Sequence, residues 1–356
     1  MAKAILVVDD SALIRKQLGG VLDKAGYDVG FAKNGAEAVD FVTNFDFDLI
    51  TMDINMPVMD GLTAVRNIMK IKPTPILMVS SLTSADADIT FECLDAGAID
   101  FILKPGTITL KVEESEQEIL SKVKTALLIP KNNLKIRKKA NLKKAQISGK
   151  SDVSQQVGQA ISSDKFGKIV VIGSSTGGPG LIEDIVKSLP SNYPYPVIVV
   201  QHMPDNFTAG FAKRLNNYTD LDVIESQNAA TLKSGQVVIA YGGKHLLLAK
   251  KASGAITLRH KNKNERFFTP SVDEIFLSVP KVMDPKNVLA VELTGIGDDG
   301  AEGMLVLRQK GAYTIAEDET TAIVYGMPKS CWENGAASKK MPFPKIVDEI
   351  LKFGRE

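Results

Sequence analysis

The stretch KIVVIGSSTGGPGLIEDIVKSL, residues 168–189, joins an apolar run to an amphipathic segment through a turn rich in glycine. A short strand that passes through such a turn into a helix is the repeating unit of α/β folds. NVLAVELTGIGDDGAEG, residues 287–303, has the same plan, whereas AYGGKHLLL, residues 240–248, predicts a hairpin. We therefore expect a C-terminal doubly wound, mostly parallel α/β domain with an antiparallel hairpin.

The N-terminal third of the chain alternates short apolar runs with amphipathic segments. The apolar runs are KAILVVDD (3–10), DVGFA (28–32), FDLITMDI (47–54), TPILMVSS (74–81) and DFILKP (100–105). This alternation predicts a parallel sheet with helices on both faces. We expect a flavodoxin-like domain of five parallel strands, with its functional crevice at the carboxyl ends of the strands.

Length and charge indicate where the domains meet. A chain of 356 residues suggests about two domains. Residues 1–128 carry 19 Asp and Glu against 12 Lys and Arg, whereas residues 129–168 carry 2 against 10. The basic stretch ends rich in Ser, Gln and Gly, which is typical of a solvated linker. We predict domains at 1–127 and 167–356, joined by a flexible basic linker at 128–166.

The composition also bears on partners and location. The basic stretch has no aromatic residue between 131 and 165, and a helix-turn-helix pattern is missing, so nucleic-acid binding is disfavoured. No apolar stretch approaches the roughly 20 residues of a membrane span, and the chain starts without a signal-peptide pattern. Cys93 and Cys331 lack metal-type spacing. We expect a cytoplasmic protein without membrane insertion.

Polar residues gather at the predicted strand ends of the N-terminal domain. Asp9, Asp10 and Asp53 follow apolar runs, and Ser80 and Lys104 do the same further along. Three carboxylates at one edge repel one another unless a cation joins them, and oxygen ligands select a hard ion such as Mg²⁺. A lysine and a hydroxyl beside them suit a transferred phosphoryl group.

The blocks VVDDS, MDINMPVMDG, MVSS and FILKP resemble, in order and spacing, the receiver domain of two-component response regulators. The resemblance implies that Asp53 accepts a phosphoryl group from a histidine kinase. It also implies that Mg²⁺ is held by Asp10, Asp53 and the backbone carbonyl of Asn55, with Asp9 assisting. Ser80 and Phe101 would be the switch pair, Lys104 would contact the phosphoryl oxygens, and the peptide before Pro105 is often cis in this family.

The glycine-rich turn at 173–177 admits two interpretations. A phosphate-binding loop fits poorly, because neither G-x-x-x-x-G-K-[ST] nor G-x-G-x-x-G is present. Gly173, Ser175 and Gly177 instead spell G-x-S-x-G, a turn that can hold a nucleophilic serine above a sheet. So short a pattern also arises by chance, so a purely structural glycine turn stays open until a base and an orienting acid are found.

A nucleophilic serine needs a base and a group that orients the base. Among the 3 histidines, His202 ends the next apolar run, which favours it over His245 and His260. Asp298 and Asp299 follow the strand pattern of residues 287–303. Either could orient the histidine, cap a helix or bind a metal. The chain order Ser, His, Asp differs from that of α/β-hydrolases.

That order, with GSSTGG, QHMPDNFTAGFAKRL, PSVDEIFLS, LTGIGDDGAEG and YGMP, resembles the chemotaxis receptor methylesterases, the CheB family of protein-glutamate methylesterases. The resemblance implies a serine esterase that needs no cofactor for its chemistry, with Ser175 as nucleophile, His202 as base and Asp299 orienting it. The Ile296 amide would help form the oxyanion hole. Ser174 stands where the family usually has alanine, Ile296 where methionine is usual, and Tyr241 where proline is usual.

The same resemblance implies substrates, partners and regulation. The substrates would be glutamate γ-methyl esters on the cytoplasmic helices of chemoreceptors, with deamidation of receptor glutamines as a second activity. A chemotaxis histidine kinase would donate the phosphoryl group, and phosphorylation of Asp53 would relieve inhibition by the receiver. Two alternatives stay open: an output domain that binds nucleotides or acts only through interactions, and a hydrolase of a different ester.

Overall fold

The computed structural model describes residues 2–81, 83–104, 112–129, 134, 164–263 and 265–355. The chain divides into two compact units, Met1–Lys139 and Ala140–Glu356. The division falls within the basic stretch predicted as a linker, most of which lies outside the described residues. Pro105, before which a cis peptide was expected, also lies outside them.

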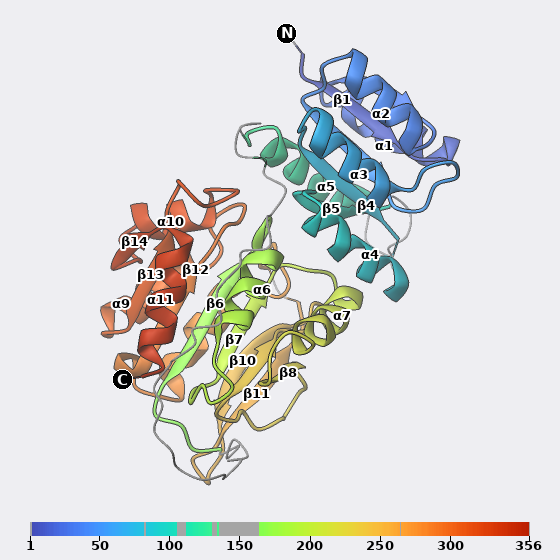
Figure 1. Ribbon diagram of the computed structural model, residues 1–356. Helices are drawn as coiled ribbons and strands as arrows, with labels where there is room; N and C mark the ends of the chain where they lie inside the picture. Colours follow the sequence, from blue (N-terminus) through green and yellow to red (C-terminus); the bar gives the residue numbers. More distant parts are fainter. Residues whose placement is uncertain are drawn as a thin grey trace, which may run out of the picture. The chain divides into compact units, whose positions relative to one another are not determined.

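The N-terminal unit is the predicted five-stranded parallel sheet, with the order β2-β1-β3-β4-β5 (Figure 1). Every strand pair in it is parallel. The order reverses between β1 and β3, and such a switch point is where α/β sheets bind their ligands. The strands and helices are β1 (Ala4–Val8), α1 (Ala12–Lys24), β2 (Asp28–Ala32), α2 (Gly35–Asn44), β3 (Leu49–Asp53), α3 (Gly61–Ile71), β4 (Ile76–Ser80), α4 (Ser84–Asp95), β5 (Asp100–Leu103) and α5 (Val112–Ala126).

Side-chain caps fix where four of these helices begin. An oxygen of each capping side chain accepts a hydrogen bond from the amide three residues on, which satisfies a donor that the helix itself leaves free. Strands β3 and β4 are buried along their whole length, as central parallel strands are. Each strand therefore ends at a defined point, close to the start of the next helix. The caps are Ser11, Asn34, Asp60 and Thr83.

The C-terminal unit is built on a seven-stranded sheet with the order β14-β13-β12-β6-β7-β9-β8, in which every pair is parallel. A separate antiparallel pair, β10–β11, completes the predicted architecture. The elements are β6 (Ile169–Ser174), α6 (Gly178–Ser188), β7 (Val197–Gln201), α7 (Asp205–Asn216), β8 (Asp222–Glu225), β9 (Gln236–Ile239), β10 (His245–Lys250), β11 (Ile256–Lys261), α8 (Val272–Ser278), η2 (Val279–Lys281), η3 (Pro285–Asn287), β12 (Val288–Glu292), α9 (Ala301–Gln309), β13 (Tyr313–Glu317), α10 (Met327–Glu333), β14 (Lys339–Met341) and α11 (Phe343–Phe353).

The packing and the strand order of the C-terminal sheet determine where its strand ends lie. One face of the sheet packs on α8, α9 and the β10–β11 hairpin, through residues such as Val171, Ile198, Leu246, Ile275 and Phe276. Strand order runs outward from β6 through β7 in one direction and from β12 through β13 in the other, so the sheet reverses between β6 and β12. The Ser175 turn thus lies at the switch point of this sheet.

The glycine pair at 242–243 precedes the hairpin and does not form its turn. The hairpin turn lies at 251–255, where the Lys251 amide donates to the Ala255 carbonyl at 2.9 Å. Gly242 is needed for a different reason, because a Cβ there would lie 2.4 Å from the Met203 carbonyl oxygen. The segment 240–248 therefore leads into the hairpin that the sequence predicted.

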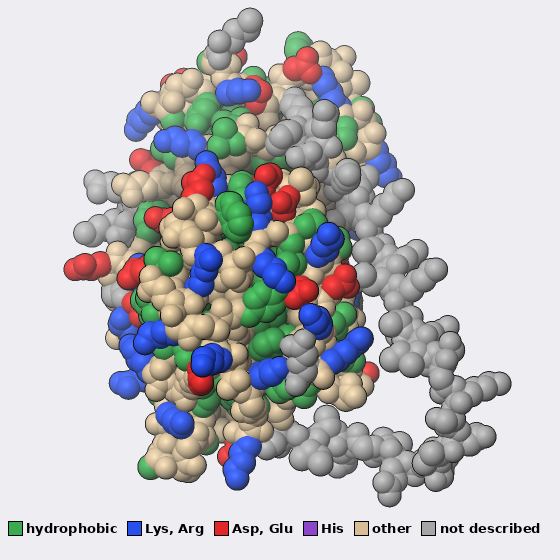
Figure 2. All heavy atoms as spheres, turned by 90° about the vertical axis from the view of Figure 1, so that its left-hand side faces the viewer, with side chains coloured by type: hydrophobic (Ala, Val, Ile, Leu, Met, Phe, Trp, Pro, Cys, Tyr) green, Lys and Arg blue, Asp and Glu red, His purple; other side chains and the backbone are tan. Residues whose placement is uncertain are grey.

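Charges of both signs are spread over the surface. On the face shown in Figure 2, Lys and Arg side chains predominate, with Asp, Glu and hydrophobic side chains scattered among them. Over the whole chain the two signs nearly balance, with 43 Lys and Arg against 42 Asp and Glu. Among the described residues, no helix combines the length and the apolar character needed to cross a membrane.

The packing of α8 generates a stability prediction. Phe276 is fully buried in the core between α8 and the sheet, so Phe276→Ala should cost about 3–5 kcal/mol in the free energy of unfolding, and Phe276→Leu less. Fluorescence of Trp332, the single tryptophan of the chain and part of α10, reports unfolding of this unit in denaturant. Equal midpoints for Ala, Leu and wild type would contradict this packing.

Candidate active site and acidic cluster

The end of β6 forms the sharp turn that the sequence predicted. β6 ends at Ser174, and α6 begins at Gly178 after Gly177, whose φ of 80° is in the left-handed region that favours glycine. The Ser175 amide donates to the Thr294 carbonyl at 2.9 Å, across to the strand end of β12. The turn is thus held from the neighbouring strand, with Ser175 nearly buried.

The two adjacent serines have different surroundings. The Ser174 hydroxyl donates to the Gln201 side-chain oxygen at 2.7 Å. The side-chain nitrogen of Gln201, Nε2, donates to the Ser175 carbonyl at 2.8 Å. Ser175 lies instead beside Gly295, where a Cβ would be 2.9 Å from the Ser175 Cβ. This fits the expected alternation of side chains along a strand end. The Ser174 side chain therefore links the ends of β6 and β7 through Gln201, whereas Ser175 faces the loop after β12.

His202 lies at the end of the strand next to β6. β6 and β7 pair in parallel with Ser174 opposite Gln201, and the His202 amide donates to the Ser174 carbonyl at 3.0 Å. Ser175 and His202 therefore come one position beyond the last strand pair on adjacent strands. Side chains at equivalent positions of paired strands point to the same face. The register brings the predicted nucleophile and the predicted base to one edge.

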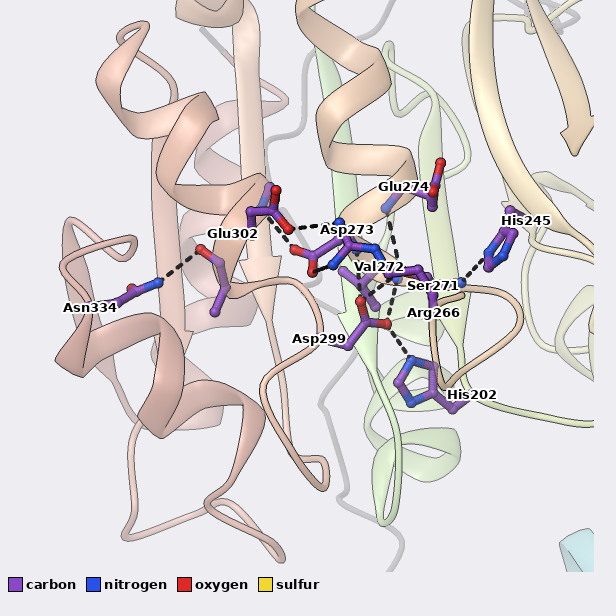
Figure 3. A network of polar contacts seen from close by, with 12 residues as sticks. His202, His245, Arg266, Ser271, Val272, Asp273, Glu274, Asp299, Glu302 and Asn334 are labelled. Atoms are coloured by element: carbon purple, nitrogen blue, oxygen red, sulfur yellow. Dashed lines mark hydrogen bonds and ion pairs between the residues drawn. The ribbon is translucent and has the colours of Figure 1, made fainter. Parts of the chain in front are cut away.

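His202 and Asp299 are directly connected. His202 Nε2 lies 2.7 Å from Asp299 Oδ2, as Figure 3 shows. His202 Nδ1 is buried and has no hydrogen-bond partner among the described residues. With one ring nitrogen held by a carboxylate and the other unoccupied, the ring has the arrangement that a general base requires.

The Asp299 carboxylate is itself held by the start of α8. Oδ1 accepts from the Ser271 hydroxyl at 2.7 Å and from the Asp273 amide at 3.0 Å, and Oδ2 accepts from the Val272 amide at 2.7 Å (Figure 3). Burial alone would raise the pKa of Asp299, but the hydrogen bonds from His202 and Ser271 outweigh it and lower the pKa to about 2. Asp299 is therefore ionised at any pH at which the protein works.

The turn after β12 offers a donor beside Ser175. The Gly295 carbonyl accepts from the amides of Gly326 and Met327, at 3.1 and 2.9 Å, which fixes the peptide that carries the Ile296 N–H. Within the described part of the chain, that N–H has no acceptor. An unpaired amide next to the nucleophile is what an oxyanion hole needs.

The other candidate side chains lie elsewhere. Asp298 is exposed, whereas Asp299 is buried. His260 Nε2 bonds the Ser226 hydroxyl at 2.9 Å and its ring stacks on Tyr241. His245 is buried and its Nδ1 accepts from the Ser271 amide at 3.2 Å, so it supports the segment that holds Asp299. Three contributors escaped the sequence reasoning: Ser271, the α8 amides, and Phe268, which stacks on His202.

Glu292, the last residue of β12, is a further acid below the site. It is fully buried, and neither carboxyl oxygen has a hydrogen-bond partner among the described residues. Cβ atoms at Gly173 and Gly300 would lie 2.6 and 2.2 Å from its oxygens, so these glycines make room for it. Burial, and then the charges of Asp299 and Asp273, raise the pKa of Glu292 well above its usual value. Burial without a hydrogen-bond donor thus favours the protonated form of Glu292.

The acidic cluster of the N-terminal unit gathers at the switch point between β1 and β3. Lys104 Nζ lies 2.9 Å from Asp53 Oδ1 and 3.3 Å from Asp9 Oδ2. Oxygens of Asp9, Asp10 and Asp53 lie within 4.8 Å of one another. This donor set, of carboxylate oxygens alone, suits a hard divalent cation.

Asp53 has one oxygen engaged and one unpaired. Oδ1 accepts from the Ile54 amide at 2.8 Å and pairs with Lys104, whereas Oδ2 is buried without a hydrogen-bond partner among the described residues. Burial raises the pKa of Asp53 to about 6, against the lowering effect of the hydrogen bond from Lys104. A cation at this cluster would offset the burial of Asp9 and Asp53 and the repulsion among the three carboxylates.

The remaining predicted residues surround the cluster at different depths. The Asn55 side chain donates to Asp86 on α4 at 2.7 Å, which leaves its backbone carbonyl as the group predicted to bind metal. Ser80 is buried, and its hydroxyl donates to the Ser81 carbonyl and accepts from Thr90. Phe101 is buried under Lys122, whose Nζ lies 4.9 Å from the ring centroid.

Comparisons with known proteins identify a matching family for each of the two units. The family model described as CheB methylesterase matches residues 170–350, and the response regulator receiver domain matches residues 5–113. A protein-glutamate methylesterase/protein-glutamine glutaminase 2 of Carboxydothermus hydrogenoformans is 44% identical over 99% of both chains. The same kind of protein from Thermotoga maritima is 39% identical over 98% of both.

A solved structure supports the C-terminal fold. The crystal structure of the Thermotoga maritima CheB methylesterase catalytic domain covers 53% of this chain and 99% of its own, with a TM-score of 0.51 and 39% identity. Fold and family matches together define a response regulator whose receiver domain is joined to a methylesterase domain of α/β architecture. The chain belongs to the CheB methylesterase family.

Glu292 gives a prediction about pH. Its folded pKa lies above that of an unfolded glutamate, about 4.3, so the folded state holds a proton that the unfolded state loses. Stability is full below that pH and declines as the pH rises toward the folded pKa. Glu292→Gln has no such proton, so its stability relative to wild type should improve as the pH rises from 5 toward the folded pKa of Glu292. Unfolding followed by Trp332 fluorescence measures this, and a difference independent of pH would contradict it.

Proposed function

We propose that this protein is a protein-glutamate methylesterase regulated by phosphorylation. Its substrates are glutamate γ-methyl esters on the cytoplasmic helices of chemoreceptors. The observation that supports this most is the buried pair of His202 and Asp299 at the strand end beside Ser175, with His202 Nδ1 unoccupied. The names of full-length relatives indicate the substrate class.

In the first step, the Ser175 hydroxyl attacks the ester carbonyl as His202 Nδ1 takes its proton. The negative charge then develops on the former carbonyl oxygen, where the Ile296 amide donates a hydrogen bond. One such donor contributes about 2.7–4 kcal/mol in comparable sites. The intermediate collapses to an acyl-enzyme as His202 returns the proton to the leaving methoxy oxygen, so methanol departs.

In the second step, water replaces the serine. His202 Nδ1 takes a proton from water, the resulting hydroxide attacks the acyl carbon, and the proton passes to Ser175 Oγ. The products are the free enzyme and a glutamic acid side chain, which releases its proton to the solvent and becomes a carboxylate. A glutamine amide fits the same sequence, with ammonia leaving in place of methanol, so deamidation is a second activity of the site.

Asp299 makes both steps possible through its charge. Its hydrogen bond fixes the proton on His202 Nε2 and therefore keeps Nδ1 as the acceptor. When His202 becomes positively charged, an ionised carboxylate 2.7 Å away stabilises that charge in a buried site. No metal or cofactor has a part in this chemistry.

The receiver domain, proposed to span 1–127, takes a phosphoryl group from a chemotaxis histidine kinase. The unpaired Oδ2 of Asp53 attacks the phosphorus while Lys104 contacts the phosphoryl oxygens, and the bond from phosphorus to the histidine nitrogen of the kinase breaks, so the kinase histidine is the leaving group. Asp9, Asp10, Asp53 and the Asn55 carbonyl would hold Mg²⁺, which supplies charge neutralisation at the transferred group. Ser80 and Phe101 respond to the new charge as the switch pair.

Regulation links the two domains through the linker at 128–166. In the absence of phosphate, the receiver restrains the esterase domain at 167–356, and phosphorylation of Asp53 shifts the population toward the unrestrained form. The reaction partners place this activity in the cytoplasm. Neither nucleic acid nor membrane insertion has a part in it.

The triad gives a direct prediction. Ser175→Ala should lower methanol release from methylated receptor fragments by about 10⁴-fold or more, and Asp299→Asn should have an effect of similar order because the wrong tautomer results. Ser174→Ala is the matched control, since its hydroxyl bonds Gln201 and not the substrate. Near-normal release by Ser175→Ala would remove serine catalysis from consideration.

Regulation gives a separate prediction. A small phosphoryl donor with Mg²⁺ should raise methanol release by wild type and leave Asp53→Ala unchanged, because only Asp53 carries the acceptor oxygen. Deletion of residues 1–165 should raise the basal rate. If the shortened protein were equally active or less active than the full chain, inhibition by the receiver would be wrong.

A further inference from the structure

A short irregular segment, residues 265–271, carries two adjacent aromatic residues, one of which contacts His202. The Phe268 ring stacks on the imidazole with centroids 4.1 Å apart and planes 17° apart. Phe267 meets Phe268 edge to face, with centroids 4.8 Å apart. Phe267 is 59% exposed, whereas Phe268 is partly buried between its neighbours. The two adjacent phenylalanines therefore have different surroundings, and only Phe268 contacts the imidazole face.

The known contacts of His202 leave one degree of freedom open. Its single side-chain hydrogen bond, from Nε2 to Asp299, fixes one atom of the ring. The ring can still swing about that bond, and Nδ1, which must face Ser175, has no partner to direct it. A flat ring against the imidazole face removes this motion, because swinging would drive the two planes into each other.

The segment that carries Phe268 is anchored on both sides. Arg266 pairs with Asp273 on α8 at 3.0 Å and with Glu302 on α9 at 2.7 Å. Ser271 donates to Asp299 at 2.7 Å, and its amide donates to His245. Figure 3 shows Arg266 and Ser271 joined to the same network as Asp299. The aromatic ring is thus held by the same frame that holds the carboxylate.

Phe268 also borders the turn that carries the proposed oxyanion donor. A Cβ on Gly297 would lie 3.9 Å from Phe268 Cε2, and Gly297 follows Ile296 directly. Phe268 therefore spans from the base to the turn after β12. An apolar ring in this place keeps water from one face of the imidazole while leaving Nδ1 at its edge.

We propose that Phe268 is a positioning residue for the esterase reaction, which sets the plane of the His202 ring so that Nδ1 faces Ser175. This rests on the proposed function. Phe268 touches neither the ester nor the reacting atoms and acts through His202 alone. Because the electron-rich face of a phenyl ring attracts cations, it also favours the imidazolium formed when Ser175 gives up its proton.

Kinetics of the full-length protein on methylated receptor fragments test this. Phe268→Leu should lower kcat by an amount on the order of a hundredfold, as expected for a misplaced base, with KM nearly unchanged. Phe268→Tyr keeps a flat ring and should retain kcat close to that of wild type. Phe267→Leu is the matched control, because its ring does not contact His202, and its kcat should stay at the wild-type value.

A second measurement separates positioning from a loss of folding. Unfolding followed by Trp332 fluorescence should show the C-terminal unit intact in Phe268→Leu. The imidazole signals of His202 in nitrogen-15 NMR should be sharp in wild type and Phe268→Tyr, and broadened in Phe268→Leu. Wild-type kcat in Phe268→Leu, or equal losses in the Leu and Tyr variants, would overturn the proposal.

The failure of this proposal differs from that of the proposed function. Wild-type protein that releases no methanol overturns the esterase itself, and the NMR comparison then still decides whether Phe268 sets the ring plane. Wild-type activity that survives in Phe268→Leu overturns only the positioning role.

Discussion

The catalytic unit depends on the hydrogen bonds that surround one buried carboxylate. Asp299 joins the loop after β12, the first amides of α8, the Ser271 hydroxyl and the His202 ring. A carboxylate buried without such donors would take up a proton and lose the charge that orients the base. Here the donors lower its pKa to about 2, despite burial that acts in the opposite direction. The start of α8 is therefore as much a part of the site as the proposed triad of Ser175, His202 and Asp299.

In both units, the topology of a parallel sheet decides where the polar side chains gather. In each sheet, the carboxyl ends of parallel strands meet where the strand order reverses, between β1 and β3 and between β6 and β12. In the N-terminal unit this edge gathers carboxylates around Lys104, which leaves an excess of negative charge and one unpaired Asp53 oxygen. In the C-terminal unit Asp299 accepts hydrogen bonds on both oxygens, and, among the described residues, His202 Nδ1 and the Ile296 amide have no partner. The first arrangement suits phosphoryl transfer, and the second suits ester hydrolysis.

The buried acid Glu292 shows that the hydrogen-bond donors around Asp299 serve only two of the three neighbouring acids. Asp299 receives the helix amides, and Asp273 receives the Gly303 amide and Arg266. Glu292, between Gly173 and Gly300, receives no donor from the described residues, and burial raises its pKa well above its usual value. The neighbouring hydrogen-bond donors and the charge of Arg266 thus stabilise Asp299 and Asp273, two of the three neighbouring acids. This selective pairing explains how a site crowded with carboxyl groups keeps its negative charge on the residue that contacts His202.

The sequence by itself determined the two sheets, the hairpin and the strand ends, because apolar periodicity and glycine-rich turns are local signals. It also indicated Ser175, His202 and the pair Asp298 and Asp299, since parallel strands bring their carboxyl ends to one edge, and the family resemblance then favoured Asp299. Only the tertiary structure decided which ring nitrogen Asp299 binds, that Ser174 serves Gln201, and that Ser271 and the α8 amides hold the carboxylate. It alone revealed Phe268 on the imidazole face and the burial of Glu292 without a hydrogen-bond partner among the described residues. These contacts join segments distant in the chain, and their geometry and desolvation arise only when the core has packed.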